Sequence, residues 1–318
     1  NPFPSAAASA PGAVSPNGWE YDNPTPYEHV WHAGGTFAIG ARQTLETLYV
    51  GSRGRNQTVT VNLNQPRRTA SGSIVPYPDF GRILFQTFAG RSQYDALEVS
   101  FDRRPSAGLS FRTSVTCSRA YDDASFGSPA RLPQDPTDIA AEWGPSEFDR
   151  PWTWTGDLTW DVPAHLRGQA QRVLGGWQAG LVLVATSGRP FTPIVSTANQ
   201  QAGFPVRPDL TGDPSVPDPS ATRWFNPAAF TPVPATEFRM GTAGRDSLRG
   251  PGDLQIDLSA AKAIRAGSRE LQLRVDAFNL PNRVNLGQPD PRIDQPTAGA
   301  IGAAGPPRQI QLGVRFLF

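Results

Sequence analysis

Apolar and polar side chains alternate with a period of two over several segments of the chain. The alternation is clearest in segments 94–102, 254–261, 270–277 and 309–318. Because successive side chains of an extended strand point to opposite faces, each segment is expected to form a β-strand with one apolar and one polar face. No segment reaches the ~18 consecutive apolar residues of a membrane-spanning helix. The pattern therefore predicts an all-β fold.

The expected strands come in four pairs, and a short turn joins the two strands of each pair. The pairs are 31–39 with 44–50, 94–102 with 109–117, 152–162 with 174–187, and 254–264 with 269–279. The short turns are 40–43, 103–108, 163–172 and 265–268. Long stretches rich in Pro, Gly, Asp and Asn separate the pairs, at 51–93, 118–151, 188–252 and 280–308. Short turns at one end and long loops at the other are typical of an antiparallel transmembrane β-barrel.

The final strand, 309–318, brings the expected count to about nine and sets the topology. If the C-terminus lies on the periplasmic side, every short turn is periplasmic and every long loop extracellular. The alternating piece 83–88 would break this order if it crossed the membrane, so it is assigned to the extracellular part of the 51–93 loop. Single-chain bacterial barrels have an even number of strands. We therefore expect a C-terminal part of a barrel, in which 1–28 is the remnant of an extracellular loop.

Aromatic residues support a membrane location for these strands. Trp152, Trp154 and Trp160 share one face of one expected strand, and Trp177 and Phe316 are placed near the periplasmic end. Outer-membrane barrels carry such aromatic girdles at both edges of an outward-facing apolar band. The alternative is a soluble β-sandwich that holds the tryptophans in its core.

Charged residues on the expected strands count against a dry sandwich interior. Glu270, Arg274 and Asp276 lie on one face of a single strand, where burial without partners would be costly but a water-filled lumen would accept them.

Overall charge and the scarcity of reactive residues exclude several classes of function. Lys and Arg total 29 against 28 for Asp and Glu, so no basic footprint for nucleic acid is present. One cysteine, Cys117, excludes an internal disulfide framework and a multi-cysteine zinc site. The chain has neither a G-x-S-x-G elbow nor a complete phosphate-binding loop. The sequence therefore predicts no enzyme, no cofactor and no resident metal.

Adjacent carboxylates at Asp122 and Asp123 leave one question open. Hard cations such as calcium favour several oxygen ligands, and Asp135 and Asp138 follow in the same expected loop. The spacing does not match an EF-hand. The favoured interpretation is that Asp122 and Asp123 belong to a hydrogen-bonded loop turn, and a calcium site is the alternative.

An ordered succession of sequence blocks resembles a known family. The C-terminal block LQLRVDAFNLPN at 271–282, closing with PRQIQLGVRFLF at 307–318, is similar to the end of Oar-like TonB-dependent outer-membrane receptors. Those receptors carry a carboxypeptidase-regulatory-like N-terminal domain. Further blocks agree in order, at 46–54, 94–101, 118–125, 174–178, 187–191, 223–230 and 244–251. The resemblance covers about residues 28–318.

The resemblance implies an architecture and a set of partners. It implies a barrel of 22 strands in the outer membrane of a Gram-negative bacterium, of which 29–318 would form the C-terminal part. A plug domain and TonB box would precede Asn1, so TonB would act through that plug. The terminal Phe318 resembles the signal read by the barrel-assembly machinery, although it could also simply fill the girdle. The other expected partners are outer-membrane lipid and an unknown ligand: an iron chelate, an oligosaccharide or a peptide.

Two groups of residues are candidates for functional surfaces within that architecture. The polar strand faces are expected to line the lumen, where opposite charges pair and dock a plug or, as the alternative, contact substrate. These lumen-facing candidates are Glu98, Asp102, Glu270, Gln272, Arg274, Asp276 and Arg315. Ligand recognition is assigned to the outer loops, especially 188–252, through the aromatic residues Trp224, Phe225 and Phe230.

The expected function is energy-coupled uptake of a scarce, large ligand through the outer membrane. One alternative is a similar barrel that acts as an adhesin or a secretion-linked surface protein. The other alternative is a secreted, soluble β-sandwich that serves as a binding module.

Overall fold

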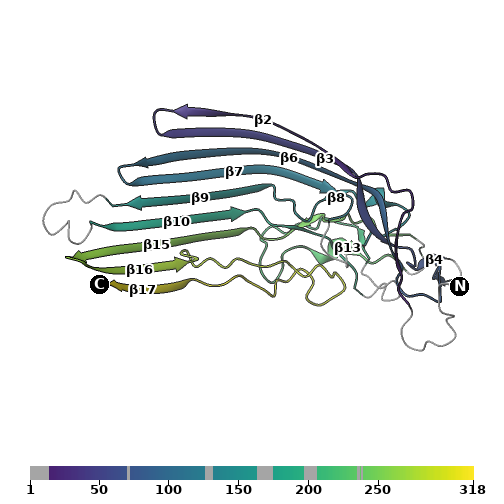
Figure 1. Ribbon diagram of the computed structural model, residues 1–318. Helices are drawn as coiled ribbons and strands as arrows, with labels where there is room; N and C mark the ends of the chain where they lie inside the picture. Colours follow the sequence, from purple (N-terminus) through teal and green to yellow (C-terminus); the bar gives the residue numbers. More distant parts are fainter. Residues whose placement is uncertain are drawn as a thin grey trace.

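The computed structural model describes residues 14–69, 72–125, 132–162, 175–196, 206–234, 237 and 239–318. Nine long strands form a single antiparallel sheet, which we call the wall, and loops are gathered at one end of it (Figure 1). The wall strands are β2 (Tyr27–Ile39), β3 (Gln43–Asn62), β6 (Leu84–Ser106), β7 (Leu109–Asp122), β9 (Trp152–Asp161), β10 (Trp177–Thr186), β15 (Asp253–Ala266), β16 (Arg269–Phe278) and β17 (Gln309–Leu317). Each wall strand pairs with the next along the chain, so the expected nine-strand antiparallel order is confirmed.

Short elements accompany the wall on its loop side. They are β1 (Asn17–Trp19), β4 (Arg67–Thr69), β5 (Gly72–Ile74), β8 (Gly144–Pro145), β11 (Pro190–Phe191), β12 (Asp209–Leu210), β13 (Phe230–Thr231), β14 (Leu248–Arg249) and the 3₁₀ turns Ile139–Glu142 and Pro227–Ala229. β1 adds to β6 in parallel, and β8 adds to β7. Among the described residues, no helix has the length and apolar character needed to cross a bilayer.

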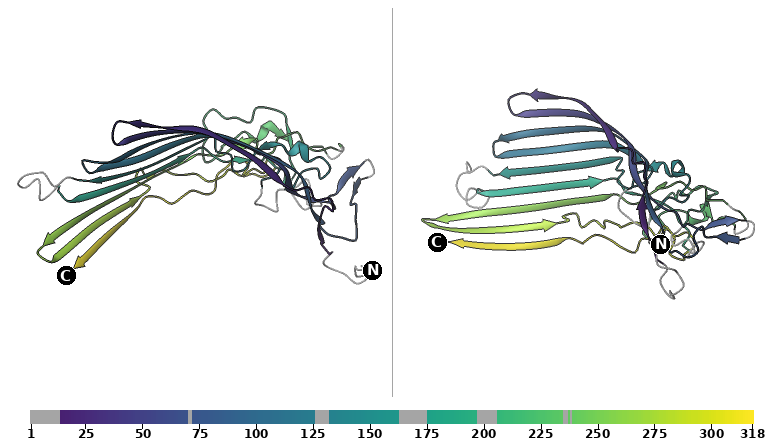
Figure 2. Two further views of the ribbon diagram at one scale, coloured as in Figure 1. Left: turned by 45° about the horizontal axis from the view of Figure 1, so that its top comes forward. Right: turned by 45° about the vertical axis from the view of Figure 1, so that its right-hand side comes forward.

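The wall is a curved sheet that ends in two edge strands, β2 and β17 (Figure 2). A curved antiparallel sheet of nine consecutive strands is the arrangement of a partial barrel wall. The expected fold class, an antiparallel barrel in part, is therefore confirmed.

The loop expected at 51–93 is shorter than the sequence indicated. β3 continues to Asn62 and β6 begins at Leu84, so the connection between them covers only 63–83. The piece 83–88 is the far end of β6 rather than a separate strand in a loop. The backbone hydrogen bonds between β3 and β6 continue through the Gly- and Arg-rich stretch that follows Val50, because main-chain groups can pair whether or not the side chains alternate. Register shifts between Gly54 and Val59 accommodate the irregular stretch.

Short turns close the other end of the wall. β6 and β7 are joined by Ala107 and Gly108 alone, with φ values of 53° and 79°. Two residues with positive φ form the type I′ turn that matches the twist of a hairpin, so the expected turn at 103–108 is tighter than the sequence indicated. Gly40 and Gly267 also adopt positive φ in their turns. The expected turn at 163–172 lies outside the described residues.

The strand register sorts the wall side chains onto two faces. Trp152, Trp154 and Trp160 of β9 lie opposite Cys117, Val115 and Leu109 of β7, in that order. The same face continues from β16 to β17, where Leu273 pairs with Val314 and Leu271 with Phe316. We call this the apolar face. The expected girdle residues all lie on it: Trp152, Trp154, Trp160, Trp177 and Phe316.

The apolar face is exposed rather than buried. Trp152 and Trp154 are each 44% exposed and Trp160 43%, while Leu312 of β17 is 78% exposed. A soluble sandwich would bury these side chains in its core, whereas large continuous apolar surfaces mark contact with a membrane or a partner. The exposure fits an outward, lipid-facing side of a barrel.

Replacing Gly108 by alanine should lower the yield of folded protein in the outer membrane. A Cβ at this position would lie 2.0 Å from the carbonyl oxygen of Asp161, and positive φ itself costs an L-residue about 1–2 kcal/mol. Heat-modifiable migration on semi-native gels measures the folded fraction. Gly302→Ala is the matched control, because no atom lies within 4 Å of the added Cβ. Equal folded fractions for the two variants would contradict the importance of this turn.

Candidate functional site

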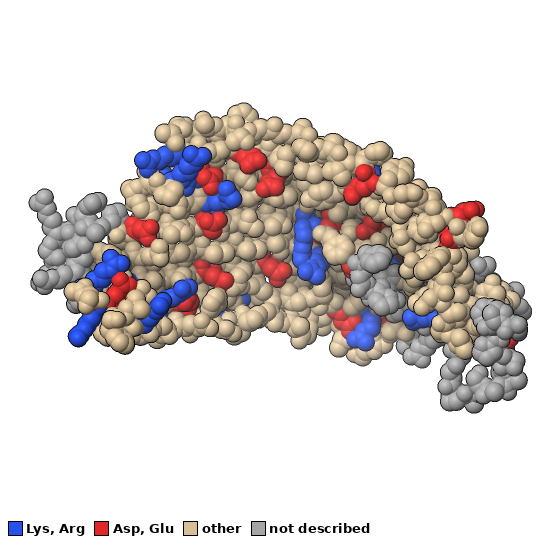
Figure 3. All heavy atoms as spheres, in the orientation of Figure 1, with Lys and Arg blue, Asp and Glu red and all other residues tan. Residues whose placement is uncertain are grey.

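The face of the wall opposite the tryptophans carries charged and hydroxyl side chains from strands β3 to β17. We call it the polar face. Figure 3 shows acidic and basic groups spread over the wall on this side. The register places all expected lumen-facing residues on it: Glu98, Asp102, Glu270, Gln272, Arg274, Asp276 and Arg315. Val182 and Val184 of β10 interrupt its polarity.

Several charges on the polar face are paired. Arg112 of β7 donates to Asp102 of β6 at 3.2 Å, and Arg265 donates to Glu270 across the β15–β16 hairpin at 2.6 Å. Arg274 pairs instead with Asp276 on its own strand, at 2.8 Å. Water screens such exposed ion pairs, so each contributes little to the stability of the fold. They therefore orient the charges of this surface rather than hold the wall together.

A hollow of about 540 Å³ lies on the polar face over β3, β6, β7 and β9. Glu98 faces it and accepts hydrogen bonds from the hydroxyls of Ser100, at 3.1 Å, and Ser114, at 3.0 Å. The lining of the hollow is rich in hydroxyl and charged side chains.

The long connections at the other end of the wall form a packed layer. We call the described parts of 123–151, 187–252 and 279–308 the loop layer. Its centre is an apolar cluster of Phe191, Phe225, Ala229, Phe230 and Ala243. The ring centroid of Phe225 lies 5.8 Å from that of Phe191 and 6.0 Å from that of Phe230. These connections therefore have a small core of their own.

Two of the three aromatic residues that were expected to contact ligand, Phe225 and Phe230, are buried. Phe225 is 2% exposed and Phe230 5%, so both rings are used in packing the loop layer. The Trp224 indole is half-buried and donates to the carbonyl oxygen of Arg249 at 2.8 Å. All three side chains position the loop segments around them.

Arginine–carboxylate pairs bind the loop segments to one another. Arg245 donates to the carboxylates of Asp122 and of Asp246, the latter at 2.9 Å, and also to the backbone carbonyl of Glu142 at 2.7 Å. Arg207 donates to the carboxylate of Glu142 at 2.5 Å. Guanidinium groups suit this role because five donors in a fixed plane reach several acceptors at once.

One further arginine pair joins the loop layer to the wall, and two more arginines bond within the layer. Arg91 of β6 pairs with Asp123 at 2.9 Å, and Arg249 pairs with Asp149 at 2.5 Å. Arg150 donates to the carbonyl oxygen of Ser187 at 2.6 Å. The pKa of Arg150 is lowered, first by burial and then by the nearby charge of Arg189.

Asp122 and Asp123 are both engaged by arginines. Asp122 also accepts from the hydroxyl of Ser125 at 3.0 Å, and Asp123 is 1% exposed. Within the part of the chain that the structure describes, no three His, Cys, Asp or Glu side chains are grouped so as to hold a metal ion. The arrangement is that of a hydrogen-bonded loop turn.

Two partly buried acidic residues of the loop layer are held in the charged form. A hydrogen bond from Arg292 lowers the pKa of Asp290 to about 2, against the opposing effect of burial. A hydrogen bond from Arg239 likewise lowers the pKa of Asp209. These carboxylates stay ionised at any physiological pH and act as structural acceptors.

The residues that organise the loop layer were not singled out by sequence reasoning. Gln134, Glu142, Arg207 and Arg245 come from segments that the sequence marked only as long loops. Two signals were available: all but one of the 29 basic residues are arginines, and the block at 244–251 contains Arg245. Neither signal identifies the partners, because these lie far away in the sequence.

Comparison with protein families identifies the class of the chain. A family described as an outer membrane β-barrel domain matches residues 1–311, and the chain belongs to that family. Its place is therefore the outer membrane of a Gram-negative bacterium. No curated protein sequence matches.

Solved structures share the fold at low identity. The chain is similar to the outer membrane transporter YddB from Escherichia coli, with a TM-score of 0.50, 13% identity, and coverage of 95% of this chain and 34% of that one. The FrpB iron transporter from Neisseria meningitidis aligns with a TM-score of 0.46 and 12% identity over 95% of this chain and 33% of that one. The chain thus spans about a third of the length of either protein. The similarity to YddB shows that its fold resembles part of an outer-membrane transporter barrel.

Replacing Arg245 by methionine should loosen the loop layer while leaving the wall folded. The change leaves Asp122 and Asp246 as buried carboxylates without this partner, and breaking a buried pair costs about 3–5 kcal/mol. Limited proteolysis of the detergent-purified protein should cut within 123–151 and 187–252 faster than in the wild type. Heat-modifiable migration should persist.

The matched control is Arg239→Met. Arg239 pairs with Asp209 and Glu237, but its side chain is 44% exposed, so solvent screens these pairs and their loss should change stability little. If both variants are cut at the same rate, the buried network around Arg245 does not hold the layer.

Proposed function

We propose that this chain forms part of the barrel of a TonB-dependent transporter that imports a scarce, large ligand. The observation that carries the proposal is the division of one wall into two faces. The exposed apolar face suits lipid, and the charged, hydroxyl-lined polar face suits a water-filled lumen. A structured loop layer at one end provides a capture surface.

Closure of the wall is part of this proposal. Among the described residues, the edge strands β2 and β17 each have a partner strand on one side only, and lipid cannot satisfy the backbone groups of the open side. Further strands must therefore complete the barrel. A plug would dock on the polar face, where Glu98, Asp102 and Arg112 supply oriented hydrogen-bonding groups. TonB would pull on that plug from the periplasm, which is the side of the short turns.

Ligand capture is assigned to the loop layer because this layer lies at the end of the wall opposite the short turns, which is the extracellular end in this proposal. The loop layer is rigidified by buried arginine pairs, so its outer surface is preorganised and loses little entropy on binding. Phe225 and Phe230 hold that surface from beneath. The Oar-like subtype remains part of the proposal and is supported by the ordered sequence blocks alone.

The two faces can be tested with cysteine labelling in intact outer membranes. Native Cys117 lies opposite Trp152 on the apolar face, while the neighbouring Thr116 borders the hollow on the polar face. A membrane-impermeant maleimide should label the Thr116→Cys, Cys117→Ala double variant at least tenfold more than the wild type. Both proteins should label alike after denaturation. Stronger labelling of the native thiol in the membrane would reverse the assigned faces.

Uptake measurements in the native host test the transport step itself. A strain lacking the gene should lose uptake of one ligand class among ferric chelates, oligosaccharides and peptides. In the parent strain a protonophore should abolish the same uptake, because energy coupling through TonB draws on the proton gradient. The competing adhesin function predicts that the deletion strain loses surface attachment and retains every uptake activity. That result would overturn the proposal.

A further inference from the structure

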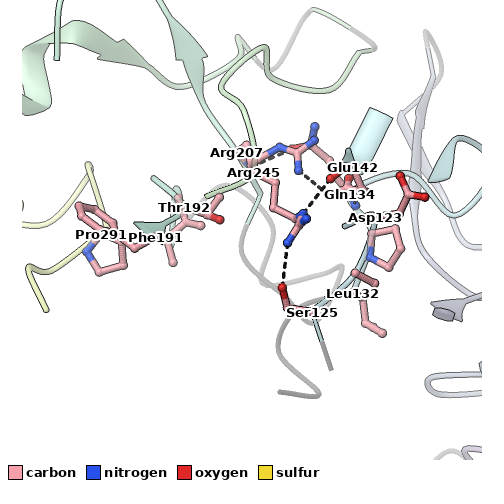
Figure 4. A pocket seen from close by; sticks show the side chains of 13 residues that line it. Asp123, Ser125, Leu132, Gln134, Glu142, Phe191, Thr192, Arg207, Arg245 and Pro291 are labelled. Atoms are coloured by element: carbon pink, nitrogen blue, oxygen red, sulfur yellow. Dashed lines mark hydrogen bonds and ion pairs between the residues drawn. The ribbon is translucent and has the colours of Figure 1, made fainter. Parts of the chain in front are cut away.

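The buried arginines at the centre of the loop layer have carboxylate partners within that layer or at its border with the wall. Arg207 pairs with Glu142, as Figure 4 shows, and Arg245 pairs with Asp122 and Asp246. The outward side of the wall differs, because it carries arginines whose charge no described carboxylate neutralises. These arginines lie where the apolar face ends.

A row of charged and aromatic side chains marks the loop-side end of the apolar face. Asp95 of β6 lies opposite Arg119 of β7, two positions beyond Cys117 on the same face. By alternation along β3 and β6, three more arginines lie on this face near the same height. The arginines of this row, which we call the basic rim, are Arg53, Arg55, Arg91 and Arg119.

The basic rim lies at the edge of the apolar band. On β7, about ten positions separate Leu109, beside the short turn, from Arg119. At about 3.3 Å per residue and a tilt of about 40°, they cover about 25 Å of height, the usual height of the apolar band of an outer-membrane barrel. On β6 the same face carries Leu97, Val99 and Phe101 across this band. The rim is therefore at the depth of lipid headgroups rather than of acyl chains.

Asp95 is engaged by three neighbours other than Arg119. Its carboxylate accepts from Arg53 at 3.1 Å, from the hydroxyl of Tyr49 at 2.8 Å and from Nε2 of Gln93 at 2.9 Å. Arg119 lies directly opposite Asp95, yet it forms no hydrogen bond or ion pair with any residue that the structure describes. Because Arg119 is also exposed, its charge is available to an external anion.

The other rim charges leave a second arginine without a counter-ion. Arg91 pairs with Asp123 at 2.9 Å, so this pair is neutral. Arg55 is exposed and donates to the backbone carbonyl of Gly54 at 3.1 Å, but it has no ion pair with a described carboxylate. The rim therefore keeps the positive charges of Arg55 and Arg119.

Aromatic rings position the two paired guanidinium groups of the rim. Arg53 lies over the ring of Trp31, 5.2 Å from its centroid, and Arg91 lies over the ring of Trp143 at 4.8 Å. Trp31 is 40% exposed and Trp143 36%. Tryptophan is enriched at membrane–water interfaces, and a long basic side chain beside it keeps its charge among the headgroups. The rings thus support the same placement of the rim as the height of the band does.

An anion at headgroup depth would neutralise Arg55 and Arg119. Guanidinium groups bind phosphate through parallel N–H donors, and such charge-assisted hydrogen bonds are about twice as strong as neutral ones. The loop end of the wall is extracellular in the proposed barrel, so the rim meets the outer leaflet. In a Gram-negative outer membrane this leaflet consists of lipopolysaccharide, whose acylated disaccharide carries phosphate groups at headgroup depth.

We propose that the basic rim binds the phosphate groups of lipid A, the acylated disaccharide of lipopolysaccharide. Arg55 and Arg119 supply the charges that bind phosphate, and the acyl chains of the same lipid lie along the adjoining apolar face. The inference rests on the orientation of the wall in the proposed barrel. It does not depend on transport.

Native mass spectrometry of the detergent-purified full chain tests this site with bisphosphorylated lipid A as the probe. The wild type should bind this lipid at least tenfold more tightly than its dephosphorylated form. The Arg55→Gln, Arg119→Gln double variant should bind the phosphorylated lipid at least tenfold more weakly than the wild type, because both free charges are removed. Arg103→Gln is the matched control and should bind as the wild type does, since Arg103 lies on the same face at the short-turn end of β6.

Heat-modifiable migration checks that each variant is folded, and the comparison of the two lipids needs the wild type alone. Equal affinity for the two lipids would overturn the site, as would equal lipid A binding by the wild type and the double variant. An equal loss in Arg103→Gln would show unspecific charge attraction and would overturn the location.

Other occupants of the rim give distinct results. Displacement of lipid A by millimolar inorganic phosphate would indicate a site for free anions, and a dimer that only the double variant abolishes would indicate a second copy of the chain. Either result would overturn the assignment to lipid. Failure of ligand uptake in cells would contradict the transport proposal and leave the lipid site standing, because lipid binding is measured on the purified protein.

Discussion

The backbone hydrogen-bond ladder between consecutive antiparallel strands is the interaction on which the rest of the structure depends. Within a membrane every N–H and C=O must be paired, because lipid offers no acceptor or donor. That requirement explains why the wall runs in strict order from β2 to β17 and why its side chains separate onto two faces. The exposed apolar face and the charged polar face both follow from this separation.

The loop layer obeys a different constraint from the wall. Its segments have little regular secondary structure, so their backbone groups and charges need individual partners. Buried arginines provide these partners, since one guanidinium can reach two carboxylates and a carbonyl at once, as Arg245 does. The small cluster around Phe225 supplies the apolar contribution. The result is an ordered surface at the loop end of the wall.

Sequence patterns predicted the wall well and the loop layer poorly. The nine strands were predictable because alternation is visible within each strand. The extent of β3 was not, because the stretch from Gly51 to Asn62 is rich in Gly and polar residues and is ordered by pairing with β6. Phe225 and Phe230 looked like exposed ligand contacts in a Pro-rich loop. Their burial depends on Phe191 and Ala243, which nothing in the local sequence connects to them.

The sequence by itself determined the all-β class, the alternation of faces, the short turns at one end and the lack of a nucleic-acid or catalytic signature. These properties depend on composition or on residues close together in the sequence, so they can be recognised without knowledge of long-range contacts. Only the tertiary structure decided which carboxylate meets which arginine. Arg245 and Asp122 lie 123 positions apart, and Arg207 and Glu142 lie 65 apart. Contacts at such separations arise only once the strand register has fixed where each loop begins and ends.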